Sequence, residues 1–231
     1  MGNRAVVALA KRCRRLARLF SVLVGGASVL AATEATVDQL IQQVESRYNH
    51  AQTVSLGFRE NYSILGHARP PEAGTLTLRK QGKMRWDYTQ PAGKLFISDG
   101  KSVFLYTAKD NRVEKIPLRD TEDIRAPLAF LLGHLDLKKE FRDFEMHAGE
   151  RGTWLEGAAK SDRAPYERIA MLVAADGSVE QLKVIGRDGS NLEFHFTNER
   201  INNPVNDELF HFTIPAGAQV VDSVGLAASE R

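Results

Sequence analysis

The sequence predicts a mainly β protein with some helix (α+β), built as a strongly curved antiparallel sheet or partial barrel whose open side is covered by helices. Three observations support this fold class. Apolar and polar residues alternate with a period of two in about ten short segments, as in strands with one dry face. Asp-Gly dipeptides, which suit two-residue turns, join consecutive segments. Helical spacing is confined to two stretches, one near the start and one in the middle.

The stretch from residue 84 to residue 106 predicts three strands joined by two turns. Met84, Trp86 and Tyr88 alternate with polar residues in the first strand. The segment Gln90-Pro91-Ala92-Gly93 ends that strand, because proline has no N–H for the ladder and glycine permits a tight turn. Asp99-Gly100 predicts the second turn. The second and third strands are apolar on both faces, so we expect this part inside the sheet and not at its edge.

An amphipathic helix is predicted between Thr36 and Asn49, where five apolar residues fall at helical spacing. The dipeptides Asp176-Gly177 and Asp188-Gly189 predict hairpin turns. The remaining strands are predicted at residues 53–61, 62–65, 74–80, 112–117, 140–147, 152–159, 168–174, 179–186, 190–198 and 208–214.

A short apolar helix is predicted in the middle of the chain, from about Ala126 to Leu132. Pro127 fits the first turn of a helix, and Gly133 ends it. Because this helix interrupts an otherwise β-rich order of elements, we expect it to cover the open side of the sheet together with the first helix.

Residues 1–31 are predicted to be a cleaved signal peptide, and residues 32–231 a single domain with a frayed tail from about residue 223. The leader is basic and holds no acidic residue, and its apolar run Leu19–Leu30 has the length of a signal-peptide core. Val29-Leu30-Ala31 has small residues where a signal peptidase reads, which places cleavage after Ala31. An uncleaved N-terminal anchor is the alternative, although Gly25 and Gly26 weaken it as a spanning helix.

The charge and cysteine content change once the leader is set aside. Of 31 Lys+Arg and 29 Asp+Glu, six bases and no acids lie in the leader, which leaves 25 bases against 29 acids and a net charge of −4. This removes the main support for nucleic-acid binding. The single cysteine is Cys13, so a chain that begins at residue 32 would have no thiol, disulfide or lipid anchor. Such a composition fits a protein of an oxidising envelope compartment.

Sequence motifs for catalysis and metal binding are absent. The six histidines form neither HxH nor HExxH, and we expect His195 and His211 to face solvent from their strands. The sequence contains no GxSxG, P-loop or GxGxxG pattern. It therefore predicts a protein that is not an enzyme and that holds no metal and no cofactor.

Several motifs in chain order resemble the LolA family of periplasmic lipoprotein carriers. Most of the likeness rests on Arg85-Trp86-Asp87-Tyr88, followed by Gln90-Pro91 and Ser98-Asp99-Gly100-Lys101. The other matching features, in order, are Phe58, Arg125-Ala126-Pro127-Leu128, Phe210-x-Phe212-x-x-Pro215 and Val220-Val221-Asp222. The resemblance covers nearly all of residues 32–231.

This resemblance implies a fold, a role and partners. The fold is an incomplete antiparallel barrel with helices that form a lid over a hydrophobic cavity. The role is that of a periplasmic carrier, whose cavity takes up the acyl chains of a lipoprotein released by an inner-membrane ABC transporter. The carrier then delivers this acylated lipoprotein cargo to an outer-membrane receptor lipoprotein. We expect a monomer that binds no nucleic acid.

The resemblance also implies which residues line the cavity. These are Met84, Trp86, Phe96, Leu128 and Leu131. An ordinary packed core is the alternative, because a core and an apolar cavity need the same side chains. Phe96 depends on which face of its strand points inward, since Leu95 and Ile97 make either face apolar.

A second implied role belongs to Lys80. It stands where the family has an arginine that holds the lid by hydrogen bonds to lid backbone, and Arg79 is adjacent. Lysine offers a point charge and not a planar fork, so a latch built on it would be looser. A solvated lysine at the end of a strand is the alternative.

Two other functions on the same fold stay open at this point. A periplasmic sensor that recognises lipid or lipoprotein would usually carry a further C-terminal domain, and this sequence ends soon after the FxFxxP pattern. A lipid-anchored receptor would need a cysteine after an apolar region, which this sequence lacks. Both observations favour the carrier.

Overall fold

The computed structural model describes residues 36–118 and 135–222. The described residues all belong to one compact unit. Its helices are α1 (Val37–His50) and α3 (Leu137–Glu140), with 3-10 turns η1 (Ala108–Asp110) and η4 (Asp207–Phe210). Its strands are β1 (Thr53–Ile64), β2 (His67–Ala68), β3 (Glu72–Arg79), β4 (Lys83–Gln90), β5 (Ala92–Asp99), β6 (Ser102–Thr107), β7 (Arg112–Pro117), β8 (Phe141–Ala148), β9 (Thr153–Ala159), β10 (Tyr166–Val173), β11 (Val179–Gly186), β12 (Ser190–Ile201) and β13 (Gln219–Asp222).

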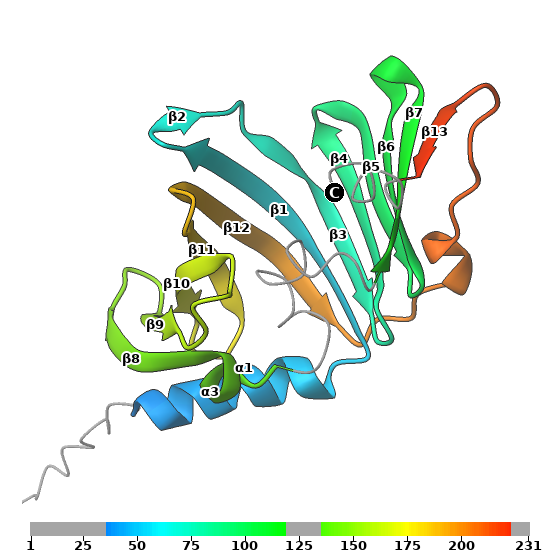
Figure 1. Cartoon of the computed structure of the whole chain (residues 1–231). Helices are drawn as coiled ribbons and strands as arrows, with labels where there is room; N and C mark the ends of the chain where they lie inside the picture. Colours follow the sequence, from blue (N-terminus) through cyan, green and yellow to red (C-terminus); the bar gives the residue numbers. More distant parts are fainter. Residues whose placement is uncertain (1–35, 119–134, 223–231) are drawn as a thin grey trace, which may run out of the picture. The chain divides into compact units, whose positions relative to one another are not determined.

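In the described residues all these strands form one 13-stranded sheet, which is strongly curved and open (Figure 1). The order is β13-β7-β6-β5-β4-β3-β1-β12-β11-β10-β9-β8, with β2 paired to β1 beside this path. Every pairing is antiparallel except that of β13 with β7, which is parallel. The first and last strands of this order do not pair with each other, so the sheet does not close into a barrel. The predicted class, an incomplete and strongly curved antiparallel barrel, is confirmed.

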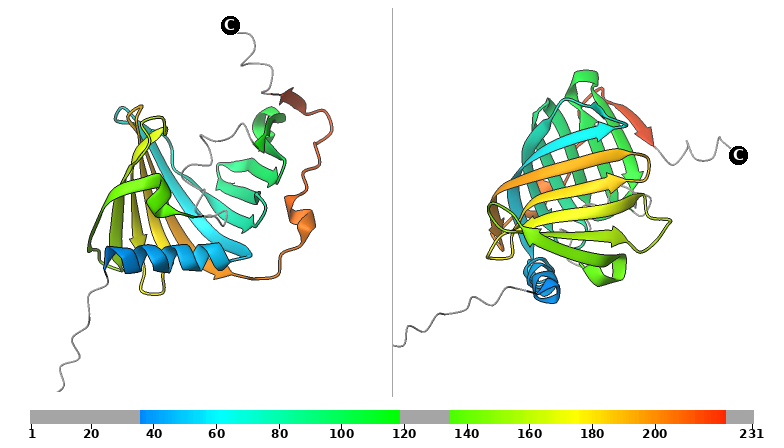
Figure 2. Two further views of the ribbon diagram at one scale, coloured as in Figure 1. Left: turned by 60° about the horizontal axis from the view of Figure 1, so that its bottom comes forward. Right: turned by 90° about the vertical axis from the view of Figure 1, so that its left-hand side faces the viewer.

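Helix α1 crosses the strands near one end of the β8–β12 half of the sheet (Figure 2). Thr36 begins it with a capping box, because its side chain accepts from the backbone of Gln39 while Gln39 reaches back to Thr36. The helix buries Leu40, Ile41, Val44 and Tyr48 on one side. The predicted helix at 36–49 is therefore confirmed within one residue at each end.

A buried polar contact fixes α1 on the sheet. The Tyr48 hydroxyl donates to Glu199 at 2.6 Å and accepts from the Val179 amide at 2.9 Å. Arg47 pairs with the same Glu199 at 2.7 Å and with Asp176 at 3.3 Å. Burial, and then the charge of Glu199, raise the pKa of Tyr48, so the phenol stays neutral and can donate.

The segment from Asp207 to Ala218 runs along the outer side of β4–β7 and not as a ladder strand (Figure 1). The strand predicted at 208–214 is therefore wrong: the Asn206 side chain caps a 3-10 turn, which ends at Phe210. Arg85 donates to the Leu209 carbonyl at 3.1 Å. The alternation of Phe210 with Phe212 has another cause, since Phe210 is 2% exposed and the Phe212 ring lies 5.3 Å from that of Phe104.

The other strands and turns predicted from the sequence can be compared with the structure. Strand β1 is continuous through residues 62–64, so the separate strand predicted at 62–65 is wrong. The predicted turns at Gly100, Gly177 and Gly189 all place glycine at positive φ, as hairpins of this length require. Strands β5 and β6 lie inside the sheet as predicted, because β7 and β13 continue beyond them. The predicted signal peptide, the helix at 126–132 and the tail from about 223 lie outside the described residues.

Candidate functional site

The concave side of the sheet carries a continuous apolar row across four neighbouring strands. The register aligns Leu56 of β1 with Leu76 of β3, Leu76 with Trp86 of β4, and Trp86 with Phe96 of β5. Leu76 and Trp86 are 0% and 3% exposed, and Phe96 packs beside them half-buried. Side chains that are directly opposite on neighbouring strands point to the same side. This side, the inner face, includes Leu56, Phe58, Leu76, Met84, Trp86, Tyr88, Phe96 and Phe194.

Aromatic rings connect the two halves of the sheet on the inner face. The Phe58 ring lies 4.6 Å from that of Trp86 and 5.2 Å from that of Tyr88, edge-on in both pairs. Trp86 in turn lies 5.7 Å from Phe194 of β12. Edge-to-face pairs at these separations are favourable beyond the area they bury.

Gly74 of β3 lies between Phe58 and Tyr88 in the register. A Cβ at this position would come within 2.1 Å of the Asp87 carbonyl oxygen. The strand therefore needs glycine here, and the absence of a side chain lets rings from β1 and β4 meet across β3. A single glycine thus permits the aromatic contact that spans three strands.

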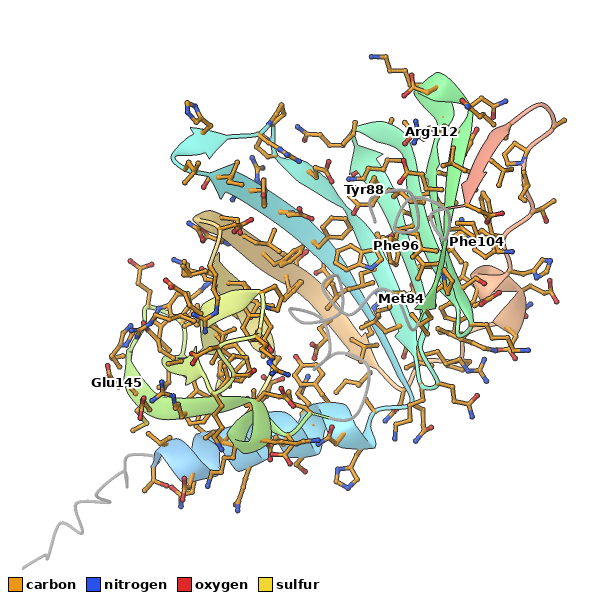
Figure 3. All side chains as sticks on the ribbon, in the orientation of Figure 1. Met84, Tyr88, Phe96, Phe104, Arg112 and Glu145 are labelled. Carbon is orange, nitrogen blue, oxygen red and sulfur yellow. The ribbon has the colours of Figure 1, made fainter. Side chains whose placement is uncertain are left out.

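Figure 3 separates the two sides of strands β4–β6. Met84, Tyr88 and Phe96 lie on the inner face, whereas Phe104 lies on the opposite side, toward the C-terminal segment. The inner face presents aromatic and aliphatic groups, which offer dispersion contacts and exclusion of water to a long apolar ligand and no reactive group.

The inner face ends in a small polar cluster. Glu60 of β1 lies opposite Glu72 of β3 in the register. The Lys94 ammonium pairs with Glu72 and also lies 4.3 Å from the centre of the Tyr88 ring. Burial first, and then the charge of Glu72, raise the pKa of Glu60, while Lys94 lowers it; together they bring it to about 7. Burial and the two carboxylates likewise raise the pKa of Tyr88.

The family model for "Outer membrane lipoprotein carrier protein LolA" matches residues 66–213, which is more than half of the chain. The chain belongs to the LolA family. An outer-membrane lipoprotein carrier protein of Cupriavidus necator is 30% identical over 156 residues, 68% of this chain and 73% of that protein. One of Nitrosospira multiformis is 26% identical over 197 residues, 83% of this chain and 93% of that protein. A crystal structure of a LolA superfamily protein from Nitrosomonas europaea has a TM-score of 0.42 at 7% identity, covering 77% of this chain and 98% of its own.

The structure places three of the residues implied by the LolA resemblance together. Met84, Trp86 and Phe96 all lie on the inner face, and the register of Phe96 with Trp86 decides the orientation that the sequence left open. Leu128 and Leu131 lie outside the described residues.

Lys80 makes a different contact from the one implied by the resemblance. Its ammonium donates to the backbone carbonyl of Asn49 at 2.9 Å, in the last turn of α1. Arg79 pairs with Asp207 and donates to the Val205 carbonyl at 3.2 Å. Both side chains thus tie the end of β3 to neighbouring segments, and a latch to residues 126–132 lies outside the described structure.

Sequence reasoning overlooked the polar cluster. The signal was present, because Glu60 continues the inward series Val54, Leu56 and Phe58 with the same spacing of two. An acidic residue on the dry face of a strand indicates an unusual environment. Lys94, in contrast, meets Glu72 across 22 positions of sequence, and only the register of β3, β4 and β5 brings the two together.

Proposed function

We propose that this chain is a periplasmic carrier that binds the acyl chains of lipoproteins on its inner face and carries them from the inner to the outer membrane. Membership of the LolA family and the names of its relatives support this proposal. The observation on which it depends is the row of apolar and aromatic side chains along the concave side of an open sheet. In the described ranges no helix is long and apolar enough to cross a membrane.

The energetics of acyl chains explain why the inner face is suited to this task. Each buried methylene contributes about 0.8 kcal/mol, so a chain of about 15 methylenes is held in a membrane by roughly 12 kcal/mol. A carrier must offer apolar surface of similar extent, or the cargo will not leave the membrane. Flat aromatic groups and leucines contact an alkyl chain without requiring a fixed chain shape, so one surface can accept several acyl chains.

The same proposal assigns the partners of the carrier, its processing and the roles of individual residues. An inner-membrane ABC transporter supplies the cargo and an outer-membrane receptor lipoprotein accepts it; the carrier is a monomer and catalyses no reaction. Residues 1–31 are removed on export, and residues 32–231 form the carrier domain. Met84, Trp86, Phe96, Leu128 and Leu131 contact the acyl chains. Lys80 or Arg79 holds a lid that covers the inner face when no cargo is bound.

Cross-linking tests where cargo binds without disturbing the core. A photoreactive benzoylphenylalanine in place of Phe96 should label a synthetic diacylated or triacylated lipopeptide after illumination. The same group in place of Phe104 is the matched control, because this half-buried phenylalanine lies on the adjacent strand and the opposite side.

Lipopeptide that binds but is labelled from position 104 and not from position 96 would overturn the proposed binding surface. Equilibrium dialysis measures whether the unmodified chain binds the lipopeptides at all. If it binds neither of them, the carrier function itself is overturned.

A further inference from the structure

Glu60 is the ionisable side chain of β1 that continues the apolar series of the inner face. It lies opposite Glu72 on β3 and opposite Phe194 on β12, two residues beyond Phe58. Its carboxyl group is therefore positioned where the aromatic part of the inner face meets the polar cluster. A ligand with apolar chains on the aromatic rings would bring its polar end to this place.

Charge is not balanced within the polar cluster. Lys94 pairs with Glu72 and covers the Tyr88 ring, so its single positive charge is already engaged. In the described part of the chain, the Glu60 carboxylate has no hydrogen bond and no ion pair. The charged groups that face it are Glu72 from β3 and Lys94 from β5, with the Tyr88 hydroxyl from β4. When Glu60 is ionised, one negative charge at the edge of an apolar surface is uncompensated.

We propose that Glu60 is a specificity-determining residue, which receives an amine at the polar end of the acyl-bearing ligand. This inference rests on the proposed carrier function and names the cargo it favours: a diacylglyceryl cysteine with a free α-amino group. An ammonium compensates the unpaired carboxylate and can donate a charge-assisted hydrogen bond to it. An N-acylated cysteine has only a neutral amide at that position, and an anionic head group would be repelled by both glutamates.

Two lipopeptides that differ in one acyl group test this preference. They share the diacylglyceryl cysteine and the peptide, and one has a free α-amino group while the other carries an N-acetyl group, which removes the charge without adding a third long chain. We expect the unmodified chain at pH 7.5 to prefer the free amine by about tenfold, and Glu60→Gln to abolish this preference. Glu193→Gln is the matched control, because Glu193 is on the neighbouring strand β12 and pairs with Lys183 away from the inner face.

A cationic ligand with one alkyl chain tests the role of the Glu60 charge independently. Dodecylammonium keeps its charge between pH 6 and pH 8, so its affinity should rise about tenfold over this range as Glu60 ionises, and stay level in Glu60→Gln. Equal affinity for the two lipopeptides, or a preference for the free amine that Glu60→Gln retains, would overturn the inference and leave the carrier function standing. Binding of neither lipopeptide would overturn the carrier function and the inference together.

Discussion

Replacing Glu60 by glutamine should remove a pH-dependent loss of stability. The pKa of Glu60 rises from 4.5 to about 7 in the folded chain, chiefly through burial and secondly through the charge of Glu72. Between these two values the folded state holds a proton that the unfolded state has released. The free energy of unfolding therefore falls as pH rises from 4.5 to 7, and the full loss is present above pH 7.

The size of this loss follows from the same two pKa values. A shift from 4.5 to about 7 corresponds to roughly 3 kcal/mol, and partial exposure of the carboxyl group reduces this figure to about 1.5 kcal/mol. Glutamine has nearly the same shape and no charge, so at pH 5 Glu60→Gln should be more stable than the unmodified chain by less than about 0.5 kcal/mol. At pH 8 it should be more stable by about 1.5 kcal/mol.

Urea unfolding followed by far-ultraviolet circular dichroism at pH 5, 6, 7 and 8 measures this difference. Glu193→Gln, on the other side of the neighbouring strand, is the control for loss of a carboxylate that already has two partners, Lys183 and His195. A stability difference between Glu60→Gln and the unmodified chain that is the same at pH 5 and pH 8 would refute the reasoning.

Two further predictions concern the attachment of α1. Tyr48→Phe should lower the free energy of unfolding by about 3 kcal/mol in urea, because the buried Val179 amide and Glu199 both lose a partner; a change below about 0.5 kcal/mol would contradict this role. Lys80→Met should cost about 1 kcal/mol in the same assay, since the ammonium bonds the Asn49 carbonyl near the C-terminus of the helix. Lys80→Arg should recover most of that stability, whereas a residue that served only as a latch to residues 126–132 would leave it unchanged.

Most of the sheet was predictable because its local signals agree with its tertiary structure. Alternation identifies β3 and β4, where Leu76, Leu78, Met84 and Trp86 are all nearly fully buried. Turn residues locate the hairpins, as at Asp99, whose side chain accepts from the amides of residues 101 and 102. Where one face is dry, the period of two also fixes the register.

The strand predicted at 208–214 shows where this reasoning fails. Phe210 and Phe212 have the spacing of a strand, but the contacts that bury them come from the outer side of β4–β7. A segment that crosses a sheet needs apolar side chains at intervals, as a strand in the sheet does, so spacing alone does not distinguish the two. The contact from Arg85 to the Leu209 carbonyl joins residues 124 positions apart and has no local signal.

The candidate site also contains residues that local sequence pattern predicts and contacts that only tertiary structure determines. The apolar members of the inner face follow from the parity of their strands, as with Trp86 and Phe58. The partners of charged residues do not, because Lys80 bonds α1 across 31 positions and Lys94 meets Glu72 only through the register of three strands. Local pattern therefore predicts which surface is apolar, and tertiary structure decides how its polar edge is arranged.

Two partly buried glutamates of this chain differ in a way that bears on function. Glu199 accepts from Tyr48 and pairs with Arg47, so its burial is compensated and it fastens α1 to the sheet. Glu60 has no such partner in the described residues, and its ionisation costs stability above pH 7. A glutamine or an apolar residue at position 60 would give a more stable inner face. A residue that lowers stability at the edge of a binding surface is most simply explained by what it contributes to binding, which for Glu60 is the proposed contact with the amine of the cargo.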